Sequence, residues 1–195
     1  MALVLVDPDK EKGEIMEISA DTVRRTLDKY SREEFLDRAY KVAFDYGANR
    51  GNCAQSTFGA LQKVLGLPDG GALKAVFLLA GGLGTSTKSA CGALAGGTAA
   101  LSCIFGRTRQ QFEDEEHTGQ GADLARKLIA RFEQEYGGIT CAAVQEKVFG
   151  RVFDLPNSES FAEFLEVNSK LKKCPEVEGK ACRWTAEIIW DELYG

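Results

Sequence analysis

The sequence predicts an all-α protein, a compact helical bundle around a central helix rich in glycine and alanine. After residue 20, apolar residues recur at helical spacing, short turn signals separate the segments, and no strand-like alternation of apolar and polar residues occurs. The connections are too short for a second domain. We therefore expect a single helical domain over residues 19–195. Residues 1–18 form an N-terminal extension of mixed character, with room for a short strand at Leu3–Val6.

The first helix is expected at Thr22–Tyr30. Ser31 and Glu34 have the spacing of a capping box, in which each residue pairs with the other's backbone at the start of a helix. The second helix therefore begins after Ser31, and Gly47 is expected to end it.

Asn52 is expected to cap the third helix, because its side chain can accept hydrogen bonds from the first turn. Gly66 and Pro68 then stop that helix. The segment Ala72–Ala80 is short and strongly apolar, so we expect it to be buried.

The central helix is expected at Lys88–Phe105, which has no charged residue after Lys88. Each glycine inside a helix costs about 1 kcal/mol relative to alanine, so several in one helix need a reason. Close packing is the favoured reason for Gly96 and Gly97. Gly92, beside Cys91, could serve either close packing or the approach of a cofactor.

A polar break over residues 113–121 precedes the next helix, which is expected at Ala122–Tyr136. Thr140 is then expected to cap a helix over Cys141–Phe149.

Another helix is expected to start at Asp154–Ser158 and to run through Leu171. Cys174-Pro175 should end it, because proline disrupts a helix interior. The last helix is expected at Lys180–Tyr194.

Four of the six cysteines follow a helix-breaking turn, at the place where a new helix should begin. Unpaired N–H groups and the positive end of the helix dipole favour a thiolate there, and the thiolate is the form that binds metals or attacks disulfides. This placement indicates redox or metal chemistry. Cys103, inside an apolar segment, is expected to be a core thiol, and Cys174 could join the site. The four cysteines are Cys53, Cys91, Cys141 and Cys182.

Composition argues against several classes of protein. A net charge of −5 and a pI near 5.1 disfavour a phosphate backbone or an anionic membrane surface as a partner. No apolar run approaches the ~20 residues that cross a bilayer, and the start has no basic region typical of a secretory signal. We therefore expect a cytoplasmic protein, in which cysteines bind metals or catalyse more often than they form structural disulfides.

Several specific sites are also disfavoured. No two cysteines have the close spacing of a zinc site, and no haem-attachment motif occurs. His117 is the only histidine and lies in an acidic stretch, so we expect it to be solvated. The glycine-rich stretch 81–85 lacks the Gly-Lys-Ser/Thr ending of a phosphate-binding loop.

With these residues identified, the chain resembles a bacterial and archaeal family of proteins that is associated with redox activity. The family is named for its pattern of a cysteine, a G-C-A-x-x-G or C-G-A-x-x-G core and two further cysteines, and the resemblance covers residues 52–193. The matching positions are Asn52-Cys53-Ala54-Gln55, then Cys91-Gly92-Ala93-Leu94-Ala95-Gly96, then Cys141, and finally Cys182, with Cys174 as an alternative fourth cysteine.

The resemblance implies an all-helical fold and a redox role. A related region occurs in split-Soret cytochromes, where similar cysteines are associated with an iron–sulfur centre beside haems. Because the haem motifs are missing here, only the iron–sulfur centre carries over as an expectation.

The leading hypothesis is that Cys53, Cys91, Cys141 and Cys182, with Gly92 beside them, hold an iron–sulfur cluster and no haem. The cluster would be of the two-iron type and would serve electron transfer or sensing. The partner would be an unidentified electron donor or acceptor and not a nucleic acid, and a homodimer is left open.

Two alternatives also stay open, and with them the question of whether the protein is an enzyme. One is a cluster-free thiol–disulfide oxidoreductase, with Cys91 as the nucleophile and Cys53 as its catalytic partner. The other is a non-enzymatic interaction module, in which the cysteines only pack and Trp184 or Trp190 belongs to an interface.

Overall fold

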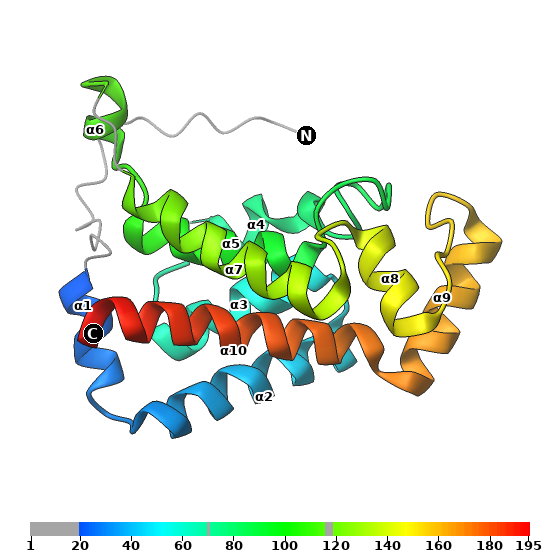
Figure 1. Cartoon of the computed structure of the whole chain (residues 1–195), viewed down its shortest axis with the longest axis horizontal. Coiled ribbons are helices and arrows are strands. Elements are labelled where there is room, and N and C mark those ends of the chain that lie inside the picture. Colours follow the sequence, from blue (N-terminus) through cyan, green and yellow to red (C-terminus); the bar gives the residue numbers. More distant parts are fainter. Residues whose placement is uncertain (1–19, 70, 116–118) are drawn as a thin grey trace, which may run out of the picture.

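The computed structural model of the chain describes residues 20–69, 71–115 and 119–195. The N-terminal extension, the short strand expected at Leu3–Val6 and His117 lie outside these residues. The predicted all-α class is confirmed, because the described residues form ten α-helices, one short 3-10 helix and no strand (Figure 1). The α-helices are α1 (Ala20–Leu27), α2 (Arg32–Arg50), α3 (Cys53–Leu65), α4 (Ala72–Ala75), α5 (Gly92–Phe105), α6 (Arg109–Glu113), α7 (Gln120–Tyr136), α8 (Cys141–Phe149), α9 (Ser158–Leu171) and α10 (Lys173–Tyr194), and the 3-10 helix is η1 (Phe77–Leu79).

Helix α10 runs along most of the molecule and packs against α2, α3, α5 and α7 (Figure 1). Large apolar side chains from these helices fill one continuous core, among them Phe35, Phe58 and Phe132. Trp184 and Trp190 pack against this core, with ring centroids 5.6 Å from Phe132 and 5.8 Å from Phe35 respectively. The two tryptophans therefore anchor α10, and an interface is not needed to explain them.

The glycine-rich helix α5 lies between α3, α7 and α10, as the sequence predicted. A Cβ atom at Gly96 would overlap the carbonyl oxygen of Ala54 on α3, and one at Gly97 would approach Thr185 Oγ1 on α10. Both glycines therefore allow close helix packing. The helix begins at Gly92 rather than Lys88, because the residues before Cys91 pair with another part of the chain.

Helix α2 does not end at Gly47 but continues to Arg50, and Gly51 follows it. A Cβ atom at Gly47 would overlap the carboxylate of Glu178 on α10. The glycine therefore serves the close approach of another helix instead of a helix stop.

The prediction that Cys174-Pro175 ends a helix is also wrong. Helix α10 begins at Lys173, and Pro175 lies in its first turn. Proline is tolerated there because a first-turn N–H group has no partner within the helix. As a result, Cys174 lies at a helix start, whereas Cys182 lies in the middle of α10.

The segment expected to be buried at Ala72–Ala80 forms α4 and η1 and is only partly buried. Val76 lies in the core, but Phe77 and Leu78 are 52% and 65% exposed. The short helix α6 was not predicted; Thr108 and Gln111 form the capping box that starts it.

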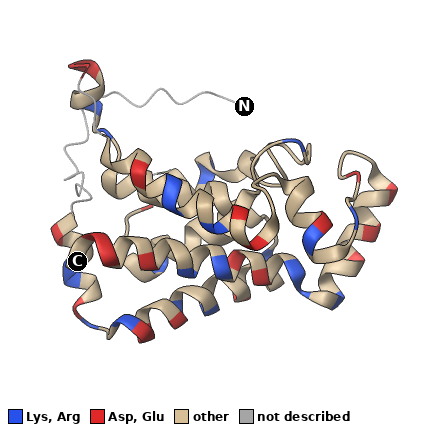
Figure 2. Ribbon diagram, viewed as in Figure 1, with Lys and Arg blue, Asp and Glu red and all other residues tan. Residues whose placement is uncertain are grey.

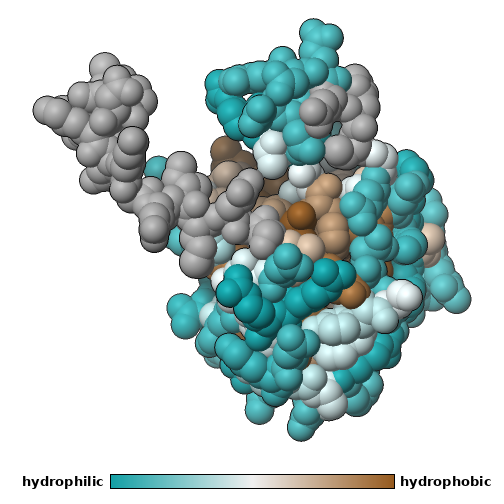
Figure 3. Space-filling model, turned by 90° about the vertical axis from the view of Figure 1, so that its left-hand side faces the viewer, coloured by the Kyte–Doolittle hydropathy of each residue, from teal (hydrophilic) through white to brown (hydrophobic). Residues whose placement is uncertain are grey.

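Charged residues of both signs alternate along the outer helices (Figure 2). Glu187 on α10 pairs with Arg32 on α2 at 2.9 Å and with Arg131 on α7 at 3.1 Å, which links three helices. Figure 3 shows apolar side chains at the end of the molecule near α1, where a hollow of about 300 Å³ is lined in part by Ile104, Phe105 and Leu193. None of the helices in the described residues is long and apolar enough to cross a membrane.

Candidate functional site

Four cysteines from four parts of the chain line a single cavity of about 240 Å³, which we call the thiol cavity. Its lining includes residues of α3, α8, α9 and α10, and α8 and α9 lie together at one end of the molecule (Figure 1). Three of these cysteines belong to the set selected from the sequence, and the fourth is the alternative named there. They are Cys53, Cys91, Cys141 and Cys174.

The structure does not bring Cys182 to this cavity. The side chain of Cys182 is fully buried in the main core, and burial alone raises the pKa of its thiol. Cys103 also lies away from the cavity and packs against the main core, as expected for a structural thiol. Cys174, which follows the turn between α9 and α10, takes the fourth position.

Cys53 is the first residue of α3 and is held by the cap before it. Asn52 accepts a hydrogen bond from the Gln55 N–H at 3.0 Å and donates one to the carbonyl oxygen of Phe77 at 3.0 Å. Gly92 does not line the cavity, but a Cβ atom there would overlap the Cys53 sulfur. Gly92 therefore makes room for the thiol of Cys53.

Cys91 and Cys141 are fixed relative to each other by backbone pairing. Ala90 and Thr140 form an isolated antiparallel bridge. The Cys91 N–H donates to the Ile139 carbonyl at 2.8 Å, and the Cys141 N–H donates to the Ser89 carbonyl at 2.9 Å. Each cysteine then begins its own helix next to the bridge.

A buried amide holds the Cys141 thiol. Gln145, one turn further along α8, donates from Nε2 to Cys141 Sγ at 3.2 Å. Its Oε1 accepts a hydrogen bond from the Phe153 N–H at 2.8 Å, which fixes the orientation of the amide. Gln145 therefore presents an N–H donor to a sulfur atom in the cavity wall.

Cys174 is positioned by the end of α9. Its N–H donates to Asn168 Oδ1 at 2.9 Å, and Lys172, in the left-handed conformation with φ 54°, makes the sharp turn between the two helices. The helix junction thus directs Cys174 into the cavity.

A buried carboxyl group also lines the cavity. Glu178 lies one turn after Cys174 on α10, is 3% exposed, and its Oε2 has no hydrogen-bond partner among the described residues. Burial raises the pKa of this carboxyl to about 8, although Ser56 acts in the opposite direction.

The rest of the wall is mostly apolar, with the polar side chains of Asn52, Thr85, Gln145 and Asn168, and no lysine, arginine or histidine belongs to the described lining. The aromatic side chains come from α9, which packs with α8 in a small separate cluster; the Phe149 and Phe164 rings lie 6.0 Å apart. The cavity therefore combines four thiols and a carboxyl with no basic side chain.

Burial, not the helix start, dominates the acidity of these thiols. It raises the pKa of Cys53 to about 12 and is also the main cause of the raised pKa values of Cys91, Cys141 and Cys174. The N–H groups of Ala93 and Leu94 do lower the pKa of Cys91, as the helix-start argument expected, but by less. Without a bound cation, the thiols are therefore protonated at neutral pH.

No group of three histidine, cysteine, aspartate or glutamate side chains in the described residues is arranged to hold a single metal ion. An iron–sulfur cluster places several irons and bridging sulfides between its cysteine ligands, so those ligands stand farther apart than around one ion. Thiols are the ligands that iron–sulfur clusters take, and four of them line this cavity.

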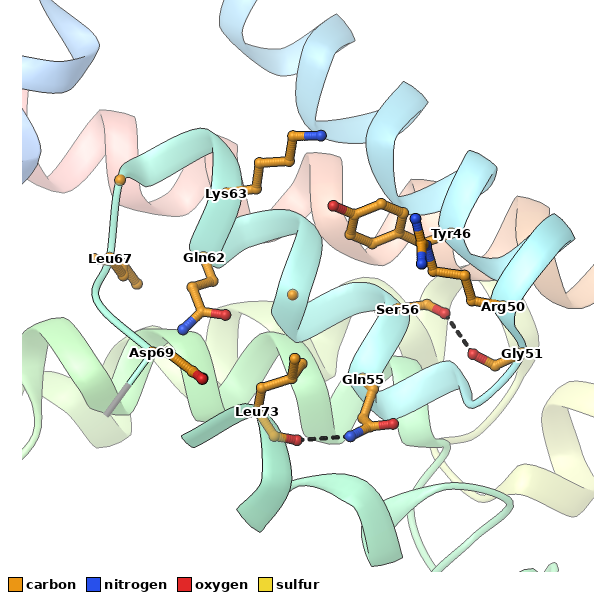
Figure 4. Close-up of a pocket in the computed structure, with 12 residues that line it drawn as sticks. Tyr46, Arg50, Gly51, Gln55, Ser56, Gln62, Lys63, Leu67, Asp69 and Leu73 are labelled. Atoms are coloured by element: carbon orange, nitrogen blue, oxygen red, sulfur yellow. Dashed lines mark hydrogen bonds between the residues drawn. The ribbon is translucent and has the colours of Figure 1, made fainter. Parts of the chain in front are cut away.

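A larger depression, which we call the polar groove, lies along α3 from Gln55 to Gly66 (Figure 4). It has a volume of about 650 Å³ and contains no cysteine. Tyr46 faces it, with Arg50 and Lys63 5.1 and 5.6 Å from the ring centroid. Gln55 and Gln62 each use their amide nitrogen to hold a nearby backbone carbonyl. No cysteine or histidine belongs to the described lining of the groove, so it offers no thiolate or imidazole ligand.

Sequence reasoning missed Gln145, Glu178 and Asn168. Gln145 and Glu178 each lie four residues after a cavity cysteine, which is the spacing that places two side chains on one helix face. This signal was usable for Gln145, because the helix over Cys141–Phe149 was predicted correctly. It was hidden for Glu178, because the start of α10 was placed at Lys180.

Neither a curated protein nor a solved structure matches the chain. The pattern of one known family, described as "Putative redox-active protein (C_GCAxxG_C_C)", matches residues 51–188. This match begins just before the first cavity cysteine and covers more than half of the chain, including all four cavity cysteines. The chain belongs to the C_GCAxxG_C_C family.

Proposed function

We propose that Cys53, Cys91, Cys141 and Cys174 bind an iron–sulfur cluster that serves electron transfer or sensing. One observation carries the proposal: four thiols from separate helix starts line a small cavity that has no basic side chain in its described lining. A cytoplasmic location and an unidentified electron donor or acceptor are part of the same proposal.

The charges of the cavity support this function. Buried thiolates without a countercharge are unstable, which is why the pKa values of the four cysteines are raised. A cationic cluster would replace the thiol protons, since a coordinating thiol is deprotonated. When bound, the cluster would accept and release an electron.

The protein supplies hydrogen-bond donors at three of the sulfurs. The N–H groups of Gly81 and Ala54 lower the pKa of Cys53, those of Ala93 and Leu94 lower that of Cys91, and Gln145 donates to Cys141. Donors of this kind stabilise thiolate ligands and tune the reduction potential of a cluster.

The size of the cavity also favours a small inorganic group. Its volume of about 240 Å³ is below the range of roughly 300–1,000 Å³ typical of sites for drug-sized organic ligands. Thiol–disulfide exchange is less well supported, because an attacking cysteine must be a thiolate and all four thiols have raised pKa values.

The test is to purify the full chain without oxygen, reconstitute it with iron and sulfide, and measure both elements per chain. We expect about two irons and two sulfides per chain, a visible absorption band, and a paramagnetic signal after one-electron reduction. Cys53→Ala should lose the cluster, whereas the matched control Cys103→Ala should retain it.

A wild-type chain that stays helical by circular dichroism but takes up neither iron nor sulfide would refute the proposal. A disulfide between two cavity cysteines in that chain, detected by mass spectrometry after alkylation, would favour the thiol-exchange alternative.

A further inference from the structure

Glu178 is an unusual residue for the interior of a protein. Its side chain is 3% exposed and lines the thiol cavity, and its Oε2 has no hydrogen-bond partner among the described residues. Glutamate is almost never fully buried without a partner, because losing hydration costs several kcal/mol unless hydrogen bonds or a cation replace it. One of its two carboxyl oxygens is therefore left without a partner from the described residues.

The surrounding chain leaves space for this carboxyl group. Gly47 on α2 carries no side chain where a Cβ atom would overlap Glu178 Oε2. The Ser56 hydroxyl donates to the Gly51 carbonyl at 2.9 Å and also favours the ionised form of Glu178. A buried apolar side chain would be the simpler solution for packing alone, so these features point to a ligand.

Glu178 shares one face of its helix with a cavity cysteine. It follows Cys174 by four residues on α10, and residues at this spacing share one face of a helix, as do the paired ligands of helical metal sites. The side chains of Cys53, Cys174 and Glu178 all line the same cavity of about 240 Å³.

We propose that Glu178 is an oxygen ligand of the metal group held in the thiol cavity, which makes the centre a mixed sulfur and oxygen site. This inference rests on the proposed function. The carboxylate would bind the metal group from the wall formed by α10, in addition to the four thiolates.

Mixed ligation has a chemical consequence. A carboxylate is a harder donor than a thiolate, so the iron that it binds differs electronically from an iron held only by sulfur. The carboxylate adds a negative charge beside the four thiolates, and the net charge around a cluster helps to set its reduction potential. We therefore expect the potential to depend on Glu178.

The test compares Glu178→Gln with Glu176→Gln in chains reconstituted with iron and sulfide. Glu176 is the matched control, because it lies on the same helix, pairs with Lys173, and does not line the thiol cavity. Glutamine keeps the size of the side chain and can still donate a hydrogen bond, but it cannot act as an anionic ligand.

We expect Glu178→Gln to bind iron on the order of 10–100-fold more weakly, the range seen when groups around a metal are lost. The iron that remains should show an altered paramagnetic spectrum and a shifted potential. Glu178→Asp should recover part of the binding, and Glu176→Gln should match the wild type in every measurement.

Equal iron content, spectrum and potential in Glu178→Gln and wild type would overturn the inference, since a carboxyl that only donates a hydrogen bond is replaced by the amide. A wild-type chain that binds no iron refutes the proposed function instead, so the two failures are distinguishable. Circular dichroism of each variant before reconstitution separates loss of fold from loss of ligand.

Discussion

The thiol cavity and the polar groove both include Gly51, at the turn that leads into α3, but they differ in what surrounds them. The groove is about 650 Å³ in volume and presents amides, an aromatic ring and two cations. The cavity is about 240 Å³ and presents four thiols and a carboxyl group. The smaller site contains the groups that can exchange electrons, so donor chemistry rather than volume identifies the candidate site.

The two regions also differ in how rigidly the chain builds them. The cavity cysteines are held by a helix cap, a buried amide and a helix junction, which are local contacts, and by a backbone bridge between residues 50 positions apart, Ala90 and Thr140. The groove is formed mainly by neighbouring parts of α2 and α3 and the segment that follows them. Changes in the cavity should therefore affect both metal binding and stability, whereas changes in the groove should affect stability only slightly.

The largest effect is expected from a comparison of Cys174→Ala with Cys182→Ala. Cys174→Ala removes a proposed ligand, so we expect most of the bound iron and sulfide to be lost. Cys182→Ala changes a fully buried core residue outside the cavity, so it should keep the cluster and lose roughly 1–3 kcal/mol of unfolding free energy. Elemental analysis and urea unfolding measure the two effects, and the opposite pattern would restore Cys182 as the fourth ligand.

The choice between Cys174 and Cys182 also shows how much of the site the sequence could predict. Helix α8 was predicted correctly at both ends, because Thr140 caps it and Gly150 follows it, and both signals are local. Pro175 is compatible with the end of one helix or with the first turn of the next. Only the packing of α10 along α2 decides between them, and this packing depends on residues more than 100 positions apart.

The same limit explains why the buried carboxyl group was missed. From the sequence alone, Glu178 cannot be distinguished from a solvent-exposed helix residue, and Gly47 is expected to end a helix. Each has its observed role only because α2 and α10 approach closely at that point. Long-range packing thus completed a site whose cysteines were mostly evident from the sequence.

A second comparison uses a glycine at the contact between α3 and α5 and a glycine at the polar groove. A Cβ atom at Gly96 would meet the backbone carbonyl of Ala54 and push apart the helices that carry Cys53 and Cys91. We expect Gly96→Ala to cost about 1–3 kcal/mol of unfolding free energy, as overpacking does, and to weaken iron binding.

Gly59→Ala is the matched change at the groove. The nearest atom to a Cβ there is a methyl group of Leu73 at 3.2 Å, which can shift, and alanine favours the helix by about 1 kcal/mol. We therefore expect a change in stability below about 1 kcal/mol and full iron binding. Urea unfolding of both variants checks this, and equal losses would mean that the close contact between α3 and α5 is not critical.

The metal-free chain should lose stability as pH rises from about 5 to about 8. Unfolded Glu178 releases its proton near its ordinary pKa of 4.5, whereas burial keeps the folded carboxyl protonated up to about 8. Folding thus takes up a proton within this window, and raising the pH opposes it. Urea unfolding with a chelator present should show this slope, and Glu178→Gln should flatten it; an unchanged slope would mean that Glu178 is hydrated when the metal is absent.

The smallest effect is expected from Lys63→Ala in the polar groove. Lys63 lies over the Tyr46 ring, and an exposed contact of this kind contributes about 0.5–1 kcal/mol. The lysine does not line the thiol cavity, so iron content and reduction potential should equal those of the wild type. Urea unfolding and a redox titration of the reconstituted chain measure both quantities. A shifted potential would show that the groove is electrically coupled to the cysteines, and the two regions would then have to be treated as parts of one site.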